Sequence, residues 1–104
     1  MRRSPAERRA AYGFPSFAAG LDACRSILQR GATPAVLRLY DDVEGARSFA
    51  TEAGVHPLVV LDEGDPAIVD ATMTVVAEAA AGAAVLDAGL VARWLEQRND
   101  VSAL

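Results

Sequence analysis

The stretch Thr33-Pro34-Ala35-Val36-Leu37-Arg38-Leu39-Tyr40-Asp41 combines a strand pattern with one charged residue. Its side chains alternate, which predicts a strand over Ala35–Tyr40 with Leu37 and Leu39 on one face. Val36, Arg38 and Tyr40 fall on the other face. A shift of one residue would bury the Arg38 guanidinium in the hydrophobic core. The face that carries Arg38 is therefore predicted to meet something polar.

The guanidinium of Arg38 restricts what that polar contact is. An arginine is always charged and offers a planar fork of donors, which suits a carboxylate, a phosphate or the electron-rich edge of a cofactor. A structural alternative stays open, in which Arg38 pairs with a neighbouring acid such as Asp41 or Glu63.

Helix signals lie on both sides of this strand. Ser16 is predicted to cap a helix of three-and-four apolar spacing that stops at Gly31, and Asp65-Pro66 to start a helix that runs to about Ala81. Asp42 is predicted to cap a short helix through Phe49. The other predicted elements are strands over Arg9–Phe14, Leu58–Asp62 and Ala84–Leu86, and a last helix that starts near Asp87 and carries Leu90, Val91, Trp94, Leu95 and Arg98.

This order of elements predicts an α+β fold of the ferredoxin-like type, an antiparallel sheet with two helices packed on one face. The second face is predicted to be uncovered and to carry four large side chains, Tyr12, Phe14, Arg38 and Tyr40. Such an aromatic surface is expected to meet a partner domain, a ligand or a second copy, so a homodimer through the exposed sheet face is one expected partner state.

Length and charge narrow the functional classes. The 104 residues suffice for one domain, and the net charge is −4. Residues 1–8 are expected to be a flexible basic lead-in, whereas from residue 10 onward six arginines face thirteen acidic residues, a balance of −7 that argues against a nucleic-acid surface. No apolar run approaches the roughly 20 residues of a membrane span, so we expect a soluble, cytoplasmic protein.

Metal and nucleophile chemistry find little support in the sequence. One histidine and one cysteine cannot build a closed zinc site, and Cys24 aligns with leucines on a helical face, which predicts a core position. His56 is expected in a loop with no nucleophile at a recognisable spacing. The acids of residues 62–65 are explained by a turn and a helix cap, so no metal site is predicted.

Several stretches carry a further pattern. They are Phe14-Pro15-Ser16-Phe17, Gly20-Leu21, Cys24-Arg25, Pro34-Ala35-Val36-Leu37-Arg38-Leu39-Tyr40-Asp41, Glu63-Gly64-Asp65-Pro66 and Trp94-Leu95-Glu96-Gln97-Arg98. Together they resemble the C-terminal, substrate-side domain of FAD-linked oxidases, and within this family they most resemble the bacterial alkyldihydroxyacetonephosphate synthase-like branch. The resemblance runs from about Arg8 to the end of the chain.

The resemblance implies an architecture similar to that of vanillyl-alcohol oxidase, in which an N-terminal domain holds FAD and the C-terminal domain caps the flavin ring and shapes the substrate pocket. Residues 9–104 would then be part of such a cap domain, and FAD would be held by a domain absent from this chain. In the family, the arginine that matches Arg38 lies close to flavin and substrate. The resemblance therefore implies a catalytic role for Arg38, whose fixed positive charge can stabilise an anionic or flavin-bound intermediate.

Tyr40, Trp94 and Arg98 are the further substrate-side candidates. Trp94 and Arg98 lie one helical turn apart and share a face, which fits either a packed indole with an arginine lying across it or a joint ligand contact. Related 2-hydroxyacid dehydrogenases carry Trp-x-x-Arg in their last helix, whereas the spacing here is Trp-x-x-x-Arg.

Three functions follow as alternatives. The intact protein is expected to be an FAD-dependent enzyme that exchanges an acyl chain for an alkyl ether on dihydroxyacetone phosphate, a small-molecule substrate. A looser relative would oxidise a 2-hydroxy acid, and a free-standing ferredoxin-like module would bind a small anion or a second copy. On the family reading, the FAD-binding half before Met1 and a histidine-bearing segment after Leu104 are missing, so the 104-residue chain alone is expected to be inactive.

Overall fold

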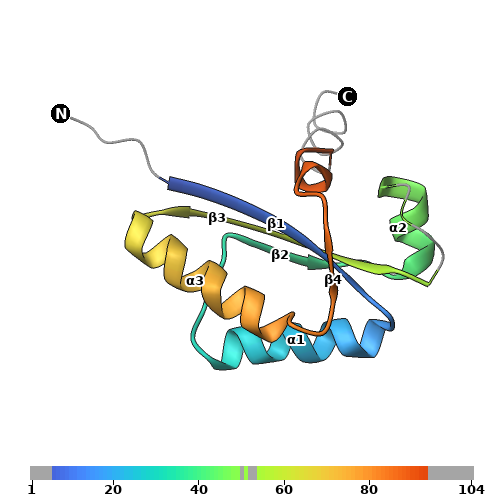
Figure 1. Cartoon of the computed structure of the whole chain (residues 1–104), viewed down its shortest axis with the longest axis horizontal. Helices are drawn as coiled ribbons and strands as arrows, with labels where there is room; N and C mark the ends of the chain where they lie inside the picture. Colours follow the sequence, from blue (N-terminus) through green and yellow to red (C-terminus); the bar gives the residue numbers. More distant parts are fainter. Residues whose placement is uncertain (1–5, 50, 52–53, 94–104) are drawn as a thin grey trace.

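The computed structural model describes residues 6–49, 51 and 54–93. Within these ranges three α-helices and four β-strands alternate along the chain (Figure 1). In order they are β1 (Ala6–Phe14), α1 (Phe17–Gln29), β2 (Val36–Leu39), α2 (Asp42–Phe49), β3 (His56–Gly64), α3 (Pro66–Ala79) and β4 (Ala84–Leu86). Residues 89–93 form the start of a further helical segment.

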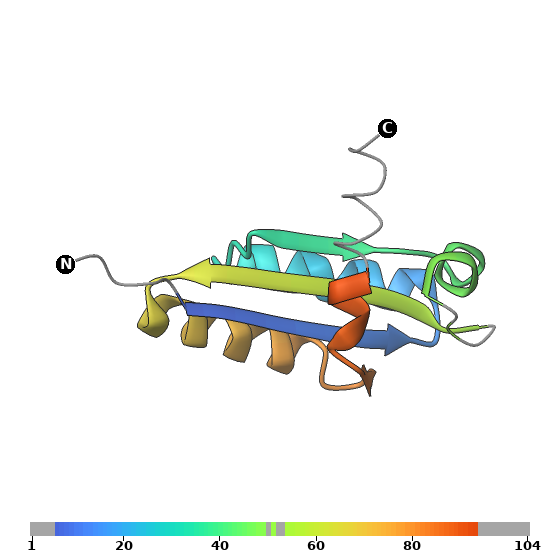
Figure 2. The ribbon, with the colours of Figure 1, turned by 90° about the horizontal axis from the view of Figure 1, so that it is seen from above.

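The four strands form one sheet in the order β2-β3-β1-β4, and every neighbouring pair is antiparallel. Helices α1 and α3 lie side by side on one face of this sheet, and α2 lies at one end of it (Figures 1 and 2). This is the ferredoxin-like arrangement, so the predicted fold class is confirmed.

The helix ends follow local hydrogen-bond chemistry. The Ser16 hydroxyl accepts a hydrogen bond from the Ala19 N–H at 3.1 Å, and the Asp65 carboxylate accepts one from the Ala67 N–H at 2.9 Å. The predicted cap of α2 was wrong by one residue. Asp41, not Asp42, accepts from the Glu44 N–H at 2.8 Å. Asp41 directly precedes the first helical residue, and a side chain at that position can reach the free N–H groups of the first turn.

Two strands are longer than the sequence pattern indicated. β1 begins at Ala6, so residues 6–8 of the expected lead-in pair with residues 62–64 of β3. β3 begins at His56, which was expected in a loop, because His56 pairs with Phe14 at the end of β1. Strand pairing from a neighbour thus extends both elements past their apolar residues.

The main core lies between the sheet and the two helices on its face. Ile27 of α1 and Val69 and Val76 of α3 are fully or almost fully buried there against Leu58 and Val60 of β3. The sheet's helix-facing residues in β2 are Leu37 and Leu39, as the alternation predicted. Arg38 must therefore lie on the opposite face of the sheet.

Candidate functional site

The candidate site is the sheet face that carries Arg38, on the side opposite to α1 and α3. Residues that pair directly across antiparallel strands share a face. Arg38 pairs with Val59 of β3, and Val59 pairs on its other side with Ala11 of β1. The Arg38 face thus has a mainly aliphatic floor, since Val59 and Ala11 are both buried.

The aromatic residues of β1 do not belong to this face, and that part of the prediction was wrong. Tyr12 pairs with Leu58, and Leu58 pairs with Leu39, so all three side chains point toward the helices. Tyr12 and Phe14 are only 9% and 5% exposed and belong to the main core. Alternation within each strand was predicted correctly. Which residues of β1 share a sheet face with Arg38 of β2, however, depends on how both strands pair with β3.

The Arg38 face is also not uncovered, contrary to the expectation from the sequence. Residues 89–93 cross it on the side away from α1 and α3 (Figure 2). Val91 is fully buried and forms a second small core with Val59 and Leu61. Val36, Tyr40 and Leu90 pack around this second core. Residues 89–93 therefore turn part of this face into an apolar wall.

A signal for this covering was present in the sequence. The run Leu58-Val59-Val60-Leu61 has no alternation, and continuous apolar strands are usually buried on both faces. Sequence reasoning thus missed Leu90 and Val91 as parts of the site, although it predicted the helix that carries them. That helix starts as expected, with the Asp87 carboxylate accepting a hydrogen bond from the Gly89 N–H at 2.9 Å.

The Arg38 side chain is exposed and makes no ion pair with any residue that the structure describes. The two acids considered as ion-pair partners of Arg38 have other roles or positions. Asp41 caps α2, and Glu63 lies four residues beyond Val59 along β3, roughly 13 Å away at strand spacing. By contrast, five other arginines pair with carboxylates, namely Arg8, Arg9, Arg25, Arg30 and Arg47. The Arg38 guanidinium is therefore exposed and unpaired among the described residues.

The other predicted site residues have different outcomes. Tyr40 is half-buried on the Arg38 face, and its backbone N–H donates to the Pro57 carbonyl oxygen at 2.9 Å, which fixes its position beside β3. Trp94 and Arg98 lie outside the described residues. The structure thus brings Arg38 and Tyr40 together on one face.

Cys24 and His56 carry side chains that can be reactive, and both pack against other residues of the fold. Cys24 is half-buried beside the main core, and burial raises the pKa of its thiol. The His56 ring packs edge-on against the Phe17 ring, with their centroids 6.3 Å apart. Its Nδ1 is buried and has no hydrogen-bond partner among the described residues. Neither side chain lies on the face of Arg38.

The acidic residues of the β3–α3 junction serve the fold. The buried Asp62 carboxylate accepts a hydrogen bond from the Ala35 N–H at 3.2 Å, and Asp65 caps α3. Across the described ranges, no three histidine, cysteine or acidic side chains gather as a metal site. None of the helices described is both long and apolar enough to cross a lipid bilayer.

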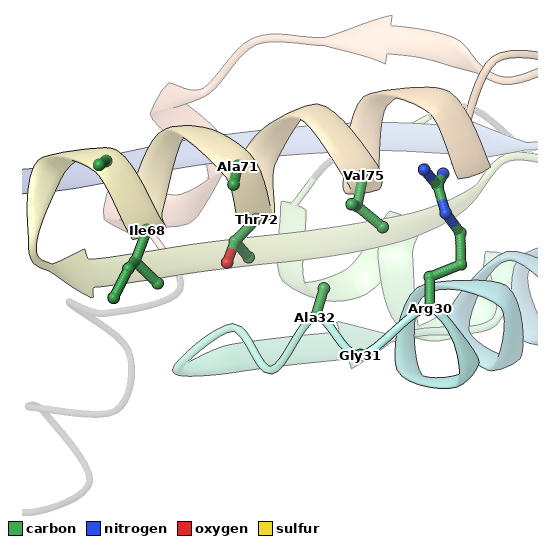
Figure 3. Close-up of a pocket in the computed structure, with 8 residues that line it drawn as sticks. Arg30, Gly31, Ala32, Ile68, Ala71, Thr72 and Val75 are labelled. Atoms are coloured by element: carbon green, nitrogen blue, oxygen red, sulfur yellow. The ribbon is translucent and has the colours of Figure 1, made fainter.

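A groove of about 350 Å³ lies on the helix side of the molecule (Figure 3). Arg30 follows α1 at one end of it, and Ile68, Thr72 and Val75 of α3 line its wall. The Arg30 guanidinium is already paired with Glu78 at 2.7 Å. Because the sheet separates this groove from Arg38, the groove belongs to a different surface.

Fold and face together define a class of protein domain. It is a ferredoxin-like α+β domain that presents an exposed arginine beside an apolar wall on one sheet face. Comparison with protein families identifies which such domain it is. The model for the C-terminal domain of FAD-linked oxidases matches residues 3–101, and the chain belongs to this family.

Solved structures agree with this assignment at the level of the fold. Two crystal forms of alkyldihydroxyacetonephosphate synthase are similar to the chain, one in space group P1 with a TM-score of 0.72 and 23% identity. The other, in P212121, has a TM-score of 0.65 and 20% identity. The matches cover 83% and 88% of this chain but only 21% and 22% of the synthase chains. A comparison with curated protein sequences finds no match.

Proposed function

We propose that this chain is the substrate-side cap domain of an FAD-dependent enzyme that resembles alkyldihydroxyacetonephosphate synthase. In this proposal the Arg38 face turns toward the flavin and the substrate. The observation that carries the proposal is the exposed Arg38 guanidinium, which lies beside an apolar wall in a domain of the FAD-linked oxidase family. The chain spans about a fifth of the synthases it resembles, so the remaining parts of the active site would come from other domains.

The described residues suit a contact with the flavin ring, but they are not suited to bind the whole FAD molecule. They contain no glycine-rich loop at a helix start of the kind that cradles a pyrophosphate. Arg38 offers planar N–H donors, which suit the polar edge of a ring system or an anionic oxygen. FAD would therefore be held by another domain, and when bound it would supply the redox-active ring.

The side chains on this face suggest how the domain would contribute. Arg38 would donate hydrogen bonds to an anionic oxygen of the substrate and would favour negative charge that develops during the reaction. Leu90 and Tyr40 lie beside the floor of the face and would exclude water from one side of that contact. Fewer waters lower the local dielectric constant, which strengthens the interaction of a fixed charge. A substrate built on dihydroxyacetone phosphate, which carries a phosphate and a ketone, fits this contact. In the proposed reaction the acyl chain of that substrate is exchanged for an alkyl ether.

The test uses the full-length protein that contains this chain, with Arg38→Ala and Arg38→Lys. If Arg38 stabilises charge in the transition state, Arg38→Ala should lower kcat by about 100- to 1,000-fold, or about 3–4 kcal/mol. Arg38→Lys should recover part of this loss, because it keeps the charge but not the planar fork. Flavin absorbance should be the same in all variants, since Arg38 is not proposed to hold FAD.

Arg25→Ala is the matched control, because Arg25 is an exposed arginine of α1 that pairs with Asp22 at 3.7 Å. Its kcat should equal that of the unmodified protein. Full turnover by Arg38→Ala with flavin bound would remove Arg38 from the active site. A full-length protein that carries no flavin would instead favour the free-standing binding module over an enzyme.

A further inference from the structure

The outer side of β2 is an open sheet edge. β2 stands first in the strand order and pairs with β3 alone among the described strands. The Tyr40 N–H points inward, toward the Pro57 carbonyl oxygen. Because the direction of backbone groups alternates along a strand, Leu39 and Leu37 direct their N–H and C=O groups away from β3. These groups can form a ladder with an added strand.

An apolar stripe on α1 accompanies this edge. It consists of Phe17, Leu21, Cys24 and Leu28, which follow each other at spacings of four, three and four residues. Phe17 and Leu21 are each 39% exposed and Leu28 is 56% exposed, which is unusual for consecutive members of one helical stripe. The core-facing residues of α1 form a separate set, Gly20, Ala23 and Ile27. We call the first set the α1 stripe.

The α1 stripe lies next to the β2 edge. Helix α1 approaches β2 closely at Gly20, where an added Cβ would lie 2.6 Å from Cδ1 of Leu39. Another side of α1, with Ala19 and Ser26, lines a depression together with Ala79 of α3. The α1 stripe is turned away from α3 and toward the free side of β2, and Figure 2 shows β2 at the edge of the sheet with α1 behind it.

We propose that a second copy of this chain binds at the β2 edge and the α1 stripe. The two β2 strands would pair antiparallel about a two-fold axis and join both sheets into one of eight strands. Neighbouring strands are about 4.8 Å apart, and a helix that packs over β2 and β3 lies slightly inside the edge. The two α1 helices would then be about 10 Å apart, which is the normal distance for packed helices.

Charge selects the register of this pairing. A two-fold axis that keeps α1 and α3 of both copies on one face can pass through any residue of β2, and an axis at Val36 would pair only that residue with β2 of the second copy. The axis at Arg38 would place two guanidinium groups directly opposite each other, which is unfavourable. The axis at Leu39 would place Asp41, the cap of α2, opposite Leu37 of the second copy in the apolar layer. The axis at Leu37 has neither conflict.

The axis at Leu37 also suits the α1 stripe. Leu37 is two residues from Leu39, or about 6.8 Å, which corresponds to four or five residues of a helix. Because Gly20 lies over Leu39, Cys24 lies near the level of Leu37. Two antiparallel α1 helices would then meet around Cys24, and Leu21 of one copy would contact Leu28 of the other. The α1 stripe is thus self-complementary under this axis.

The size of the surface predicts a weak dimer. The proposed contact surface is the side of the α1–β2 layer. Its length is that of α1, about 20 Å for thirteen helical residues, and its height is that of a helix stacked on a strand, about 15 Å. Each copy therefore contributes about 300 Å² in projection. Stable dimers bury about 800 Å² per partner, which makes a concentration-dependent dimer the expected state. The Arg38 face offers less apolar area to a second copy, because Val91 already covers Val59 and Leu61.

Sedimentation velocity of the chain of residues 1–104 over a wide concentration range tests the proposal. The unmodified chain should shift from monomer toward dimer as concentration rises. Leu28→Glu and Leu21→Glu should each weaken association at least tenfold, because a carboxylate would be buried in the α1–α1 contact. Ile68→Glu is the matched control, since Ile68 is a 65% exposed apolar residue of α3 outside this surface. Its dimerisation should be unchanged.

The double variant Leu21→Glu/Leu28→Arg tests the register. In the proposed dimer each new glutamate faces a new arginine of the other copy. Association of the double variant should therefore be stronger than that of Leu21→Glu alone or of Leu28→Arg alone. Failure of the pair to recover would overturn the axis at Leu37. A chain that is monomeric at every concentration, or a dimer unaffected by both glutamates, would overturn the interface. Hydrogen exchange that slows at α1 only in the full-length protein would assign this surface to another part of the same polypeptide.

Discussion

Gly45 is the position where two opposing effects of a single methyl group can be weighed. It is a buried glycine in α2, and its N–H donates to the Asp41 carbonyl oxygen at 2.9 Å. A Cβ at this position would lie 2.7 Å from Cδ and 2.8 Å from Cγ of Pro57, and 2.7 Å from Oγ1 of Thr51. Carbon atoms prefer separations of about 3.5–4.0 Å. The proline ring cannot rotate away, because it belongs to the backbone of β3.

The substitution Gly45→Ala therefore has a predictable sign. Alanine in a helix interior is favoured over glycine by about 1 kcal/mol. Overpacking a close contact costs about 1–3 kcal/mol, since α2 must move almost 1 Å away from Pro57 and loses contacts along its length. We expect the free energy of unfolding to fall by up to about 2 kcal/mol. For a domain of this size a loss of about 2 kcal/mol corresponds to a decrease in Tm of about 8–15 °C.

Urea denaturation followed by far-UV circular dichroism measures this change. Gly82→Ala is the control, because a Cβ at Gly82 would meet nothing within 4 Å. Its stability should equal or slightly exceed that of the unmodified chain. If Gly45→Ala were as stable as Gly82→Ala, then α2 would not be held against Pro57 and the reasoning would be refuted.

Two further predictions concern α3 and Cys24. Asp65→Ala should lower the free energy of unfolding by about 1 kcal/mol, because the Ala67 N–H loses its acceptor, whereas Asp65→Asn should keep most of it; equal losses in urea titrations would contradict the cap. Burial raises the pKa of the Cys24 thiol, so iodoacetamide at about pH 8 should alkylate the folded chain more slowly than the unfolded chain. The same shift stabilises the fold fully below the thiol's unfolded pKa, and this contribution is lost as the pH rises through the folded value. Alkylation at equal rates in both states would show that the thiol is not desolvated.

Local chemistry determines where most helices and strands form. Ser16 and Asp65 each carry a side-chain acceptor next to an apolar helical pattern, and both cap helices as predicted. The strands and helices predicted within the described residues all occur, and the ferredoxin-like fold follows from their order. The bounds differ where a neighbouring strand extends an element, as at Ala6 and His56.

The sequence by itself determined that Arg38 lies on the sheet face away from α1 and α3, because alternation places it opposite to Leu37 and Leu39. Only the tertiary structure decided what shares that face. Tyr12 was expected beside Arg38 and is buried in the core, because register between strands is a long-range property that alternation within one strand does not contain. The placement of Val91 over Val59 depends in the same way on contacts between residues far apart in the chain.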